Sequence, residues 1–339
     1  MRSFEDRRAR TRLIAIALAA LSAAAALVAM GLGAARLSPG EVLRAVGAAL
    51  TGQGASGTAY TIVMNVRLPR VLTSYVVGAA LAVCGACMQG LFRNPMADPH
   101  LLGVSSGAAL GVAVATLTGA GALRALTGTF AFAFAIGTVI VVLVLSRVRG
   151  RVSTMSLLLA GIAVSSLLSA ITSGLMIVNR EHMDEVYMWT MGSFTASDWD
   201  KFAYAAPVML LGMLGIMAFA RDLNAMLMGE QEARQLGVQV RRVRIVLLGL
   251  CTLVTAMAVS VSGVIGFVGL MVPHGLRLIC GPDHRSLLPL SVLAGGLYLL
   301  IMDTLARTVM MPIEIPIGVL TALVGGPFFL YLMRRRNAR

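Results

Sequence analysis

Long apolar stretches recur from one end of the chain to the other, and they constrain the fold more than any other feature. A helix needs about 20 apolar residues to cross a bilayer. Only 13% of the 339 residues are charged, against about 25% in soluble domains. We therefore expect an all-α polytopic membrane protein in which 1–339 form a single transmembrane domain. The ten expected spans lie near 13–34, 71–91, 101–118, 126–146, 154–178, 202–220, 245–262, 264–280, 287–306 and 316–333.

The basic residues indicate how these spans are oriented. With a cytoplasmic N-terminus, 20 of the 28 Lys and Arg residues fall in cytoplasmic ends and loops. This bias follows the positive-inside rule and predicts an even number of spans, with both tails, 1–12 and 334–339, in the cytoplasm. The net charge of +13 is then mainly an orientation signal rather than a sign of nucleic-acid binding. The first span follows an Arg-rich start, but it is longer than a signal-peptide core and predicts a retained helix.

Two segments interrupt the apolar pattern at membrane depth. The stretch "GLFRNPMADPHLLGVSSG", 90–107, has the residues of a non-helical turn, in which Asp98 can accept hydrogen bonds from freed amides. The residues alone favour a plain loop with turn chemistry. The stretch "SGVIGFVGLMVPHGLRL", 262–278, combines glycines with a proline, and irregular backbone is tolerated there only inside protein or along a cavity. Together with "MPIEIPIGVLTALVGGPFF", which again combines glycines with prolines, this second stretch favours a transport pathway or a moving part over a simple anchor.

A polar segment, "RDLNAMLMGEQEARQLGVQVRRVR", separates the sixth and seventh expected spans. Its pattern predicts two short helices within 222–238, which turn at Gly229 and end near Gly237. Such a pair on the cytoplasmic face suits the docking of a soluble partner. An interfacial helix pair that lies on anionic lipid is the alternative, and the residues alone leave both open.

Several function classes lack their residues in this sequence. The histidines are scattered, neither HExxH nor G-x-S-x-G occurs, and we expect no catalytic site. A phosphate-binding loop needs a lysine after its second glycine, and the only lysine is Lys201, in "DWDKFA". Cys84 and Cys87 have the spacing of a metal pair without a second pair, so they are expected to be packing residues. An ion-coupled secondary transporter would depend on Asp303, although Arg307, four residues on, can neutralise it.

Taken together, the segments resemble the FecCD-type (type II) permease family of binding-protein-dependent ABC importers for iron–siderophore, haem and cobalamin. The resemblance covers nearly the whole chain. It rests on "RLPRVL", "GAALAVCGACMQGLFRNPMADPHLLGVSSGAALG", "LLLAGIAVSSL", "MWTMGSF", "GEQEARQLGV", "SGVIGFVGLMVPHGLRL", "DHRSLLPLS", "DTLART" and "EIPIGVLTALVGGPFFLYL", in the family's order and at its spacing.

This resemblance implies partners and roles for particular residues. The partners would be two copies of an ABC ATPase subunit, which would hold ATP and Mg²⁺, an extracytoplasmic binding protein, and a second permease subunit, most simply an identical one. The location would be a bacterial inner membrane. ATPase coupling would fall to Gly229, Glu230, Ala233, Arg234, Leu236 and Gly237; the cytoplasmic gate to Met96, Ser153 and Thr154; and binding-protein docking to Arg67, Arg70 and Arg307.

The substrate is the least constrained part of this expectation. The resemblance places the pathway between two permease subunits, along the fifth and tenth spans, and ranks a ferric siderophore first, haem second and cobalamin third. One outer segment carries potential haem ligands, because haem iron accepts His or Met. These are His182, Met183, Met188 and Met191. The chain holds 21 methionines, however, and methionine often only fills gaps between helices. We expect no metal or cofactor bound by the chain itself.

Overall fold

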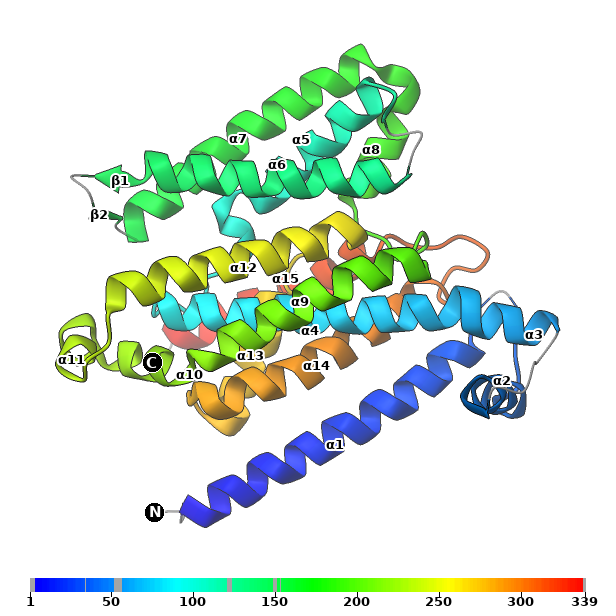
Figure 1. Ribbon diagram of the computed structural model, residues 1–339, viewed down its shortest axis with the longest axis horizontal. Coiled ribbons are helices and arrows are strands. Elements are labelled where there is room, and N and C mark those ends of the chain that lie inside the picture. Colours follow the sequence, from blue (N-terminus) through cyan, green and yellow to red (C-terminus); the bar gives the residue numbers. More distant parts are fainter. Residues whose placement is uncertain are drawn as a thin grey trace.

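The computed structural model describes residues 4–33, 35–51, 57–120, 124–148, 151–152 and 154–337. These residues form a bundle of helices with one two-residue strand pair, β1 (Arg147–Val148) and β2 (Arg151–Val152) (Figure 1). The helices are α1 (Phe4–Gly31), α2 (Pro39–Thr51), α3 (Thr58–Thr61), π-helical η1 (Ile62–Arg67), α4 (Leu68–Leu91), 3₁₀-helical η2 (Pro99–Leu102), α5 (Val104–Leu117), α6 (Arg124–Leu145), α7 (Thr154–Val178), 3₁₀-helical η4 (Arg180–His182), α8 (Met183–Thr190), α9 (Trp199–Ala218), α10 (Ala220–Met228), α11 (Glu230–Gln235), α12 (Val240–Ser262), α13 (Val268–Cys280), α14 (His284–Ala306) and α15 (Ile317–Asn337).

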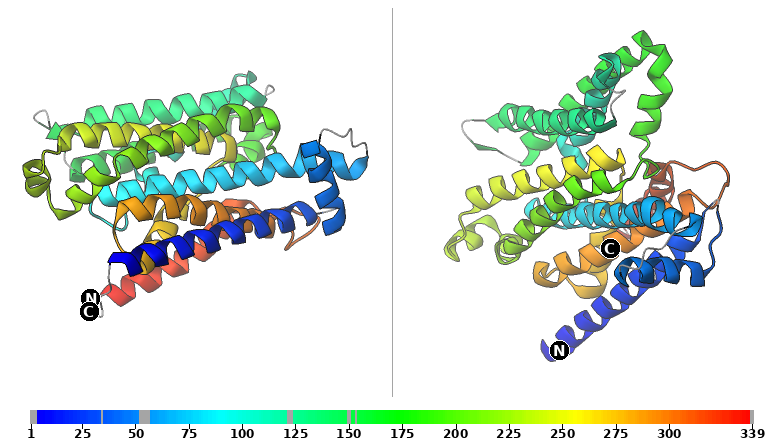
Figure 2. Two further views of the ribbon diagram at one scale, coloured as in Figure 1. Left: turned by 60° about the horizontal axis from the view of Figure 1, so that its bottom comes forward. Right: turned by 45° about the vertical axis from the view of Figure 1, so that its right-hand side comes forward.

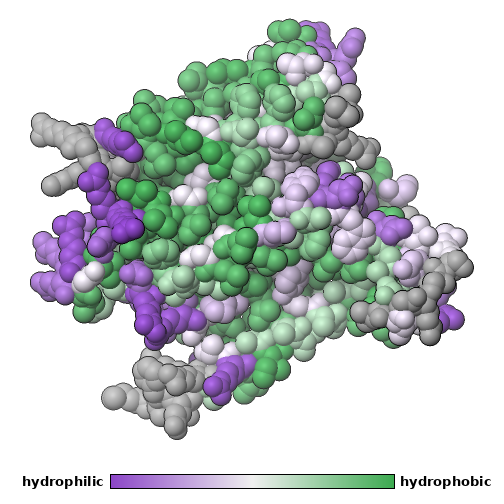
Figure 3. Space-filling model, viewed as in Figure 1, coloured by the Kyte–Doolittle hydropathy of each residue, from purple (hydrophilic) through white to green (hydrophobic). Residues whose placement is uncertain are grey.

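The helices confirm a polytopic membrane protein. Within the described residues, 7 helices are long and apolar enough to cross a bilayer, and three shorter apolar helices, α5, α13 and α15, complete the ten expected segments. Hydrophobic side chains cover the middle of the molecule and hydrophilic ones gather at its two ends (Figure 3). α13 begins four residues later than predicted, because Gly263 and Phe267 take left-handed φ values of 69° and 68°. The irregular backbone that the sequence predicted at this depth is therefore confirmed.

α4 is the central helix of the bundle. It packs against α9, α12, α13 and α14, and its span is 83% buried, whereas that of α1, at one edge, is 11% buried. α5, α6 and α7 form a group on the far side of α12 (Figure 1). Small residues let α4 approach its neighbours closely: a Cβ atom added to Gly78 would lie 2.3 Å from the carbonyl oxygen of Gly295 on α14.

The two ends of the bundle differ. One end of the bundle carries α10, α11, the strand pair, the N-terminal end of α1 and the C-terminal end of α15. The other end carries α2 and α3 (Figures 1 and 2). This arrangement agrees with the expectation that both tails share one side of the membrane, and their orientation stays a prediction. Which compartment that side faces stays a prediction from the charge bias.

Candidate functional site

The segment between α9 and α12 forms the expected pair of short helices. α10 buries Ala220, Leu223 and Met226 against the bundle. Gly229, at φ 143°, separates α10 from α11, and Gly237, at φ 85°, follows α11. Both glycines thus stand at backbone positions that favour glycine. The predicted turn and end are confirmed, although the first helix begins at Ala220, earlier than the sequence indicated.

The predicted coupling residues divide into anchors and exposed groups. The carboxylate of Glu230 accepts a hydrogen bond from Arg244 on α12, which fixes α11 to the bundle. Ala233 is fully buried and packs inward, so it offers no contact surface of its own. Arg234, 3.8 Å from Glu230, has a side chain that is 68% exposed, and Leu236 is 65% exposed. Among the predicted coupling residues, the accessible side chains are therefore a guanidinium group and an apolar side chain two positions apart.

A basic hollow adjoins this exposed face. Its volume is about 620 Å³, and its lining combines arginines with aliphatic side chains from the end of the helix pair and the first turns of α12. The lining residues are Arg234, Val238, Gln239, Val240, Arg241, Arg242, Ile245 and Val246. A hollow lined by arginine and aliphatic side chains is complementary to a partner surface that combines acidic and apolar side chains.

The Glu230–Arg244 pair predicts a pH dependence for α11. The hydrogen bond from Arg244 holds the pKa of Glu230 below its ordinary value of 4.5. The pair therefore stabilises the fold above that value and loses its effect as the pH falls through the lower, folded-state pKa. Because Glu230 is partly exposed, we expect only an about two- to threefold rise in amide exchange of Glu230–Gln235 between about pH 5 and pH 3, after correction for intrinsic rates. In Glu230→Gln this extra rise should disappear; an equal rise there would contradict the assignment.

The polar turn that follows α4 has the chemistry that the sequence indicated. Asn94 Oδ1 accepts the amide of Met96 at 3.0 Å, and Asp98 Oδ1 accepts the amide of His100 at 2.8 Å. Arg93 takes a positive φ of 48°. The expected role of Asp98 in satisfying a freed amide is confirmed. Met96 is half-buried in this turn.

The opposing half of the predicted gate lies at the start of α7. Thr154 is the first residue of α7, and Ser153 lies outside the described residues. α7 passes close to η2, since a Cβ atom added to Gly161 would lie 2.2 Å from the carbonyl oxygen of Leu101. The turn and α7 are thus neighbours within one chain, and the gating roles of Met96 and Thr154 stay predictions.

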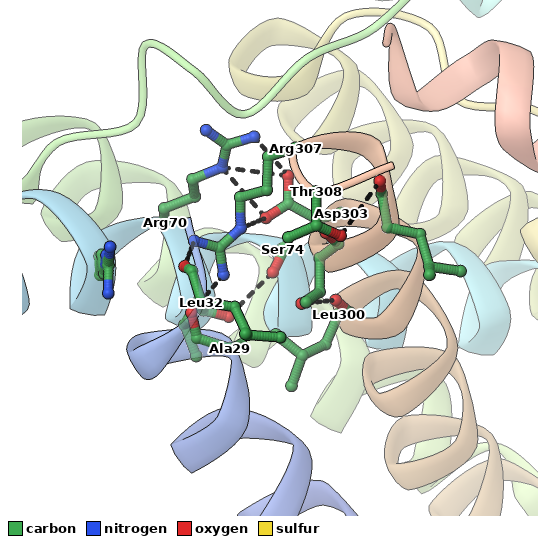
Figure 4. A network of polar contacts seen from close by, with 12 residues as sticks. Ala29, Leu32, Arg70, Ser74, Leu300, Asp303, Arg307 and Thr308 are labelled. Atoms are coloured by element: carbon green, nitrogen blue, oxygen red, sulfur yellow. Dashed lines mark hydrogen bonds and ion pairs between the residues drawn. The ribbon is translucent and has the colours of Figure 1, made fainter. Parts of the chain in front are cut away.

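A buried cluster of charges occupies the opposite end of the bundle (Figure 4). The guanidinium group of Arg70 donates to both carboxylate oxygens of Asp303, at 2.8 to 3.1 Å, and to Glu314, at 3.0 and 3.1 Å. Arg307 Nε lies 3.7 Å from Asp303. Thr195 donates its hydroxyl hydrogen to Glu314 at 2.7 Å. The cluster therefore links α4 and α14 to the two loops that precede α9 and α15.

Arg307 and a third arginine, Arg67, also cap the C-terminal end of α1. Arg307 donates to the carbonyl oxygens of Leu32, at 2.8 Å, and Ala29, and Arg67 donates to those of Met30 and Ala35. The last carbonyl groups of a helix have no partner within it, and guanidinium donors satisfy them here.

The structure places the three predicted docking arginines inside the chain. Arg67, Arg70 and Arg307 are only 5, 9 and 6% exposed, and each donates hydrogen bonds to groups within the chain. Their role in docking a binding protein stays a prediction. The sequence also paired Asp303 with Arg307 alone, whereas its closest partner is Arg70, 233 positions away in sequence. No local spacing could have indicated that contact.

The outer histidine and methionines are distributed over η4, α8 and the loop that follows α8, and their role in a pathway stays a prediction. His182, Met183 and Met188 are exposed along η4 and α8, and His182 lies 3.6 Å from Glu185. Met191 lies against the start of α15, where its carbonyl oxygen accepts the amide of Gly318 at 3.0 Å. Among the residues that the structure describes, no three His, Cys, Asp or Glu side chains are placed to hold a metal ion. Cys84, Cys87 and Cys251 are buried free thiols in the helix core.

Comparison with known proteins agrees with this architecture. A model of the FecCD transport family matches residues 11–335. The cobalamin import system permease protein BtuC of Halobacterium salinarum is 44% identical over 286 residues, 84% of this chain and 77% of that protein. The hemin transport system permease protein HmuU of Yersinia pestis is 43% identical over 282 residues, 81% of this chain and 83% of that protein.

Among solved structures, a metal-chelate type ABC transporter in an inward-facing conformation has the same fold. Its chain matches with a TM-score of 0.84 and 34% identity, over 96% of this chain and 99% of that one. The ten apolar helices of the described residues, the polar α10–α11 pair and the family match over nearly the whole length agree with one another. This protein is a membrane-embedded transport subunit of an ABC importer, and it belongs to the FecCD transport family.

Proposed function

We propose that this chain is the permease through which a binding-protein-dependent importer moves a metal held in a tetrapyrrole, cobalamin or haem, into the cytoplasm of a bacterium. A separate ATPase subunit would supply the energy. The observation that carries the proposal is the α10–α11 pair, which presents Arg234 and Leu236 at one end of a ten-helix bundle and is anchored to that bundle through Glu230. The described N-terminal end of α1 and C-terminal end of α15 lie at the same end, and the charge bias favours the cytoplasm as the compartment there.

The names of the relatives change the order of expected substrates. The sequence analysis ranked ferric siderophores above haem and cobalamin. The two relatives described above are named for cobalamin and hemin import, and at 44 and 43% identity they support a tetrapyrrole as the cargo. Selectivity would reside mainly in the binding protein.

The surface of α7 supports a pathway between two copies of the chain. Ser166, Ser169 and Ser173 are exposed at intervals of three and four residues, which places them on one face of the helix. Ser173 donates its hydroxyl hydrogen to the carbonyl oxygen of Ser169 at 2.9 Å, and a water-filled passage or a partner helix would accommodate these polar groups better than lipid. A second copy of this chain that faces α7 would thus enclose a weakly polar passage.

Recovery of the ATPase subunit tests the coupling element. When the detergent-solubilised wild-type complex is captured through this chain, the ATPase should be recovered with it, whereas Arg234→Glu should lose most of it. The reason is that an exposed cation beside an apolar residue becomes an anion at the centre of the contact. Arg180→Glu, an exposed arginine near the opposite end, is the control and should retain the ATPase. Equal recovery with both variants would remove Arg234 from the interface.

Transport in proteoliposomes tests the cargo. With the binding protein outside and ATP inside, we expect uptake of cyanocobalamin or haemin and none without ATP. Uptake of only a ferric siderophore would replace the proposed substrate and leave the transport mechanism intact. Uptake that an ion gradient drives without the ATPase would instead support the secondary-transporter alternative and overturn the proposal.

A further inference from the structure

Asn224 joins the cytoplasmic helix pair to the first turn of α14. Its Oδ1 accepts the amide of His284 at 2.8 Å and lies 3.0 Å from His284 Nδ1, while its Nδ2 donates to Asp283 Oδ1 at 2.6 Å. An amide oxygen can only accept, so the imidazole carries its hydrogen on Nδ1. The side chain of Asn224 thus makes three polar contacts with Asp283 and His284 at the start of α14. α10 lies directly beside the start of that helix (Figure 1).

His284 carries this contact onward to α4. Its side chain is fully buried, and its ring lies against Gly90: a Cβ atom added to Gly90 would stand 2.4 Å from Nε2 and 2.8 Å from Cε1. Only a glycine lets the ring approach the helix so closely. The imidazole is therefore a rigid spacer between the start of α14 and the last turn of α4.

The polar turn that contains Met96 begins at this point of α4. The amide of Arg93 donates to the carbonyl oxygen of Gly90 at 3.2 Å, and the amide of Asn94 donates to that of Gln89 at 3.1 Å. On the other side of the helix, the amide of the Gln89 side chain donates to the carbonyl oxygens of Gly269 and Leu270, both at 3.1 Å. The end of α4 is consequently held between α13 and the His284 ring, and a displacement of either must move the turn.

We propose that Asn224 and His284 are positioning residues that transmit displacement of the α10–α11 pair to the end of α4 and the Met96 turn. This inference rests on the proposed function, because it assumes that an ATPase subunit moves the pair. Neither residue would contact the cargo or ATP. The link consists of hydrogen bonds on one side and close packing on the other, and packed contacts of this kind pass on a shift rather than absorb it.

A charge exchange across the Asn224–Asp283 contact tests the link. Asn224→Asp places a second carboxylate beside Asp283, whereas Asn224→Asp combined with Asp283→Asn restores one acid and one amide, with the amide donor now on α14. The exchanged amide at position 283 can still accept the amide of Arg285, as Asp283 does at 3.0 Å. Since Asp283 Oδ1 accepts both from Asn224 and from Arg285 in the wild type, the asparagine introduced at position 283 would use its Nδ2 for the carboxylate at position 224 and its Oδ1 for the amide of Arg285, so that each contact again has one donor and one acceptor.

The measurement is substrate transported per ATP hydrolysed by the complete complex in proteoliposomes, with ATPase recovery determined in parallel. Asn224→Ala and Asn224→Asp should each bind the ATPase within about twofold of wild type but transport about tenfold less per ATP. Asn224→Ala loses all three contacts with the start of α14, whereas Asn224→Asp can still accept from His284 but replaces the hydrogen bond to Asp283 with repulsion between two carboxylates. The exchanged double variant should recover at least half of the wild-type ratio. Asn65→Ala, at an exposed asparagine on η1, is the matched control and should be unchanged.

The outcomes separate this inference from the proposed function. Wild-type coupling in Asn224→Ala, or an exchanged variant no better than Asn224→Asp, would overturn the link while the importer assignment stood. Failure of the wild-type chain to bind any ATPase would overturn the importer assignment, and the link with it.

Discussion

Replacing Arg70 with methionine is expected to lower the free energy of unfolding by about 3–5 kcal/mol, the usual cost of removing one partner of a buried ion pair. Asp303 is 1% exposed and receives most of its hydrogen bonds from Arg70. Without that guanidinium group, the carboxylate keeps only Arg307 at 3.7 Å. Glu314 also loses its tie to α4, so the loop before α15 should become more mobile.

A compensated variant separates the ion pair from simple loss of packing. Arg70→Met combined with Asp303→Asn removes both charges at similar volume, and it should be more stable than Arg70→Met alone, because no uncompensated carboxylate remains buried. Arg44→Met, at an exposed arginine on α2, should stay within about 0.5 kcal/mol of the wild type. Unfolding by titration with sodium dodecyl sulfate would measure all three. A double variant as unstable as the single one would show that the pair itself contributes little.

The positions of the helices could be predicted largely from the sequence. Apolar length and the distribution of basic residues suffice to place ten segments, because lipid requires each crossing backbone to satisfy its own hydrogen bonds. The same holds for α10 and α11, whose turn at Gly229 and end at Gly237 are local backbone events. Asp98 belongs here too, since its hydrogen bond reaches an amide only two residues away.

The contacts of the charged residues could not be predicted in this way. Arg70 meets Asp303 and Glu314 across 233 and 244 positions, and Arg67 meets the end of α1 across 37 and 32 positions. Depth in the membrane indicates that these arginines lie near a surface, but not whether they turn outward or inward. Their direction is decided by unsatisfied carbonyl groups at the end of α1 and by two acids on another helix and its loop, which only the packed structure brings together.

A close helix crossing predicts the second large effect. A Cβ atom added to Gly85, in the middle of α4, would lie 1.9 Å from the carbonyl oxygen of Gly269 and 2.4 Å from its Cα atom. Backbone atoms cannot move aside as a flexible side chain would. Gly85→Val should therefore push α13 away from α4 and cost at least about 3 kcal/mol, the upper range for overpacked cores. Since Gln89 holds the end of α4 to the same turn of α13, this displacement would also disturb the Met96 turn.

The same substitution at an open position separates the crossing from any general intolerance of valine. A Cβ atom at Gly137 on α6 meets nothing within 4 Å, so Gly137→Val changes helix propensity and lipid contact but no packing. We expect Gly137→Val to elute as a single folded species on size-exclusion chromatography in detergent, and Gly85→Val to aggregate or to unfold at markedly lower detergent stress. Because lipid provides no hydrophobic drive for helix association, the closeness of such crossings is a main source of cohesion in the bundle. Equal behaviour of the two variants would mean that α4 and α13 can separate at little cost, and that the crossing does not hold the Met96 turn in place.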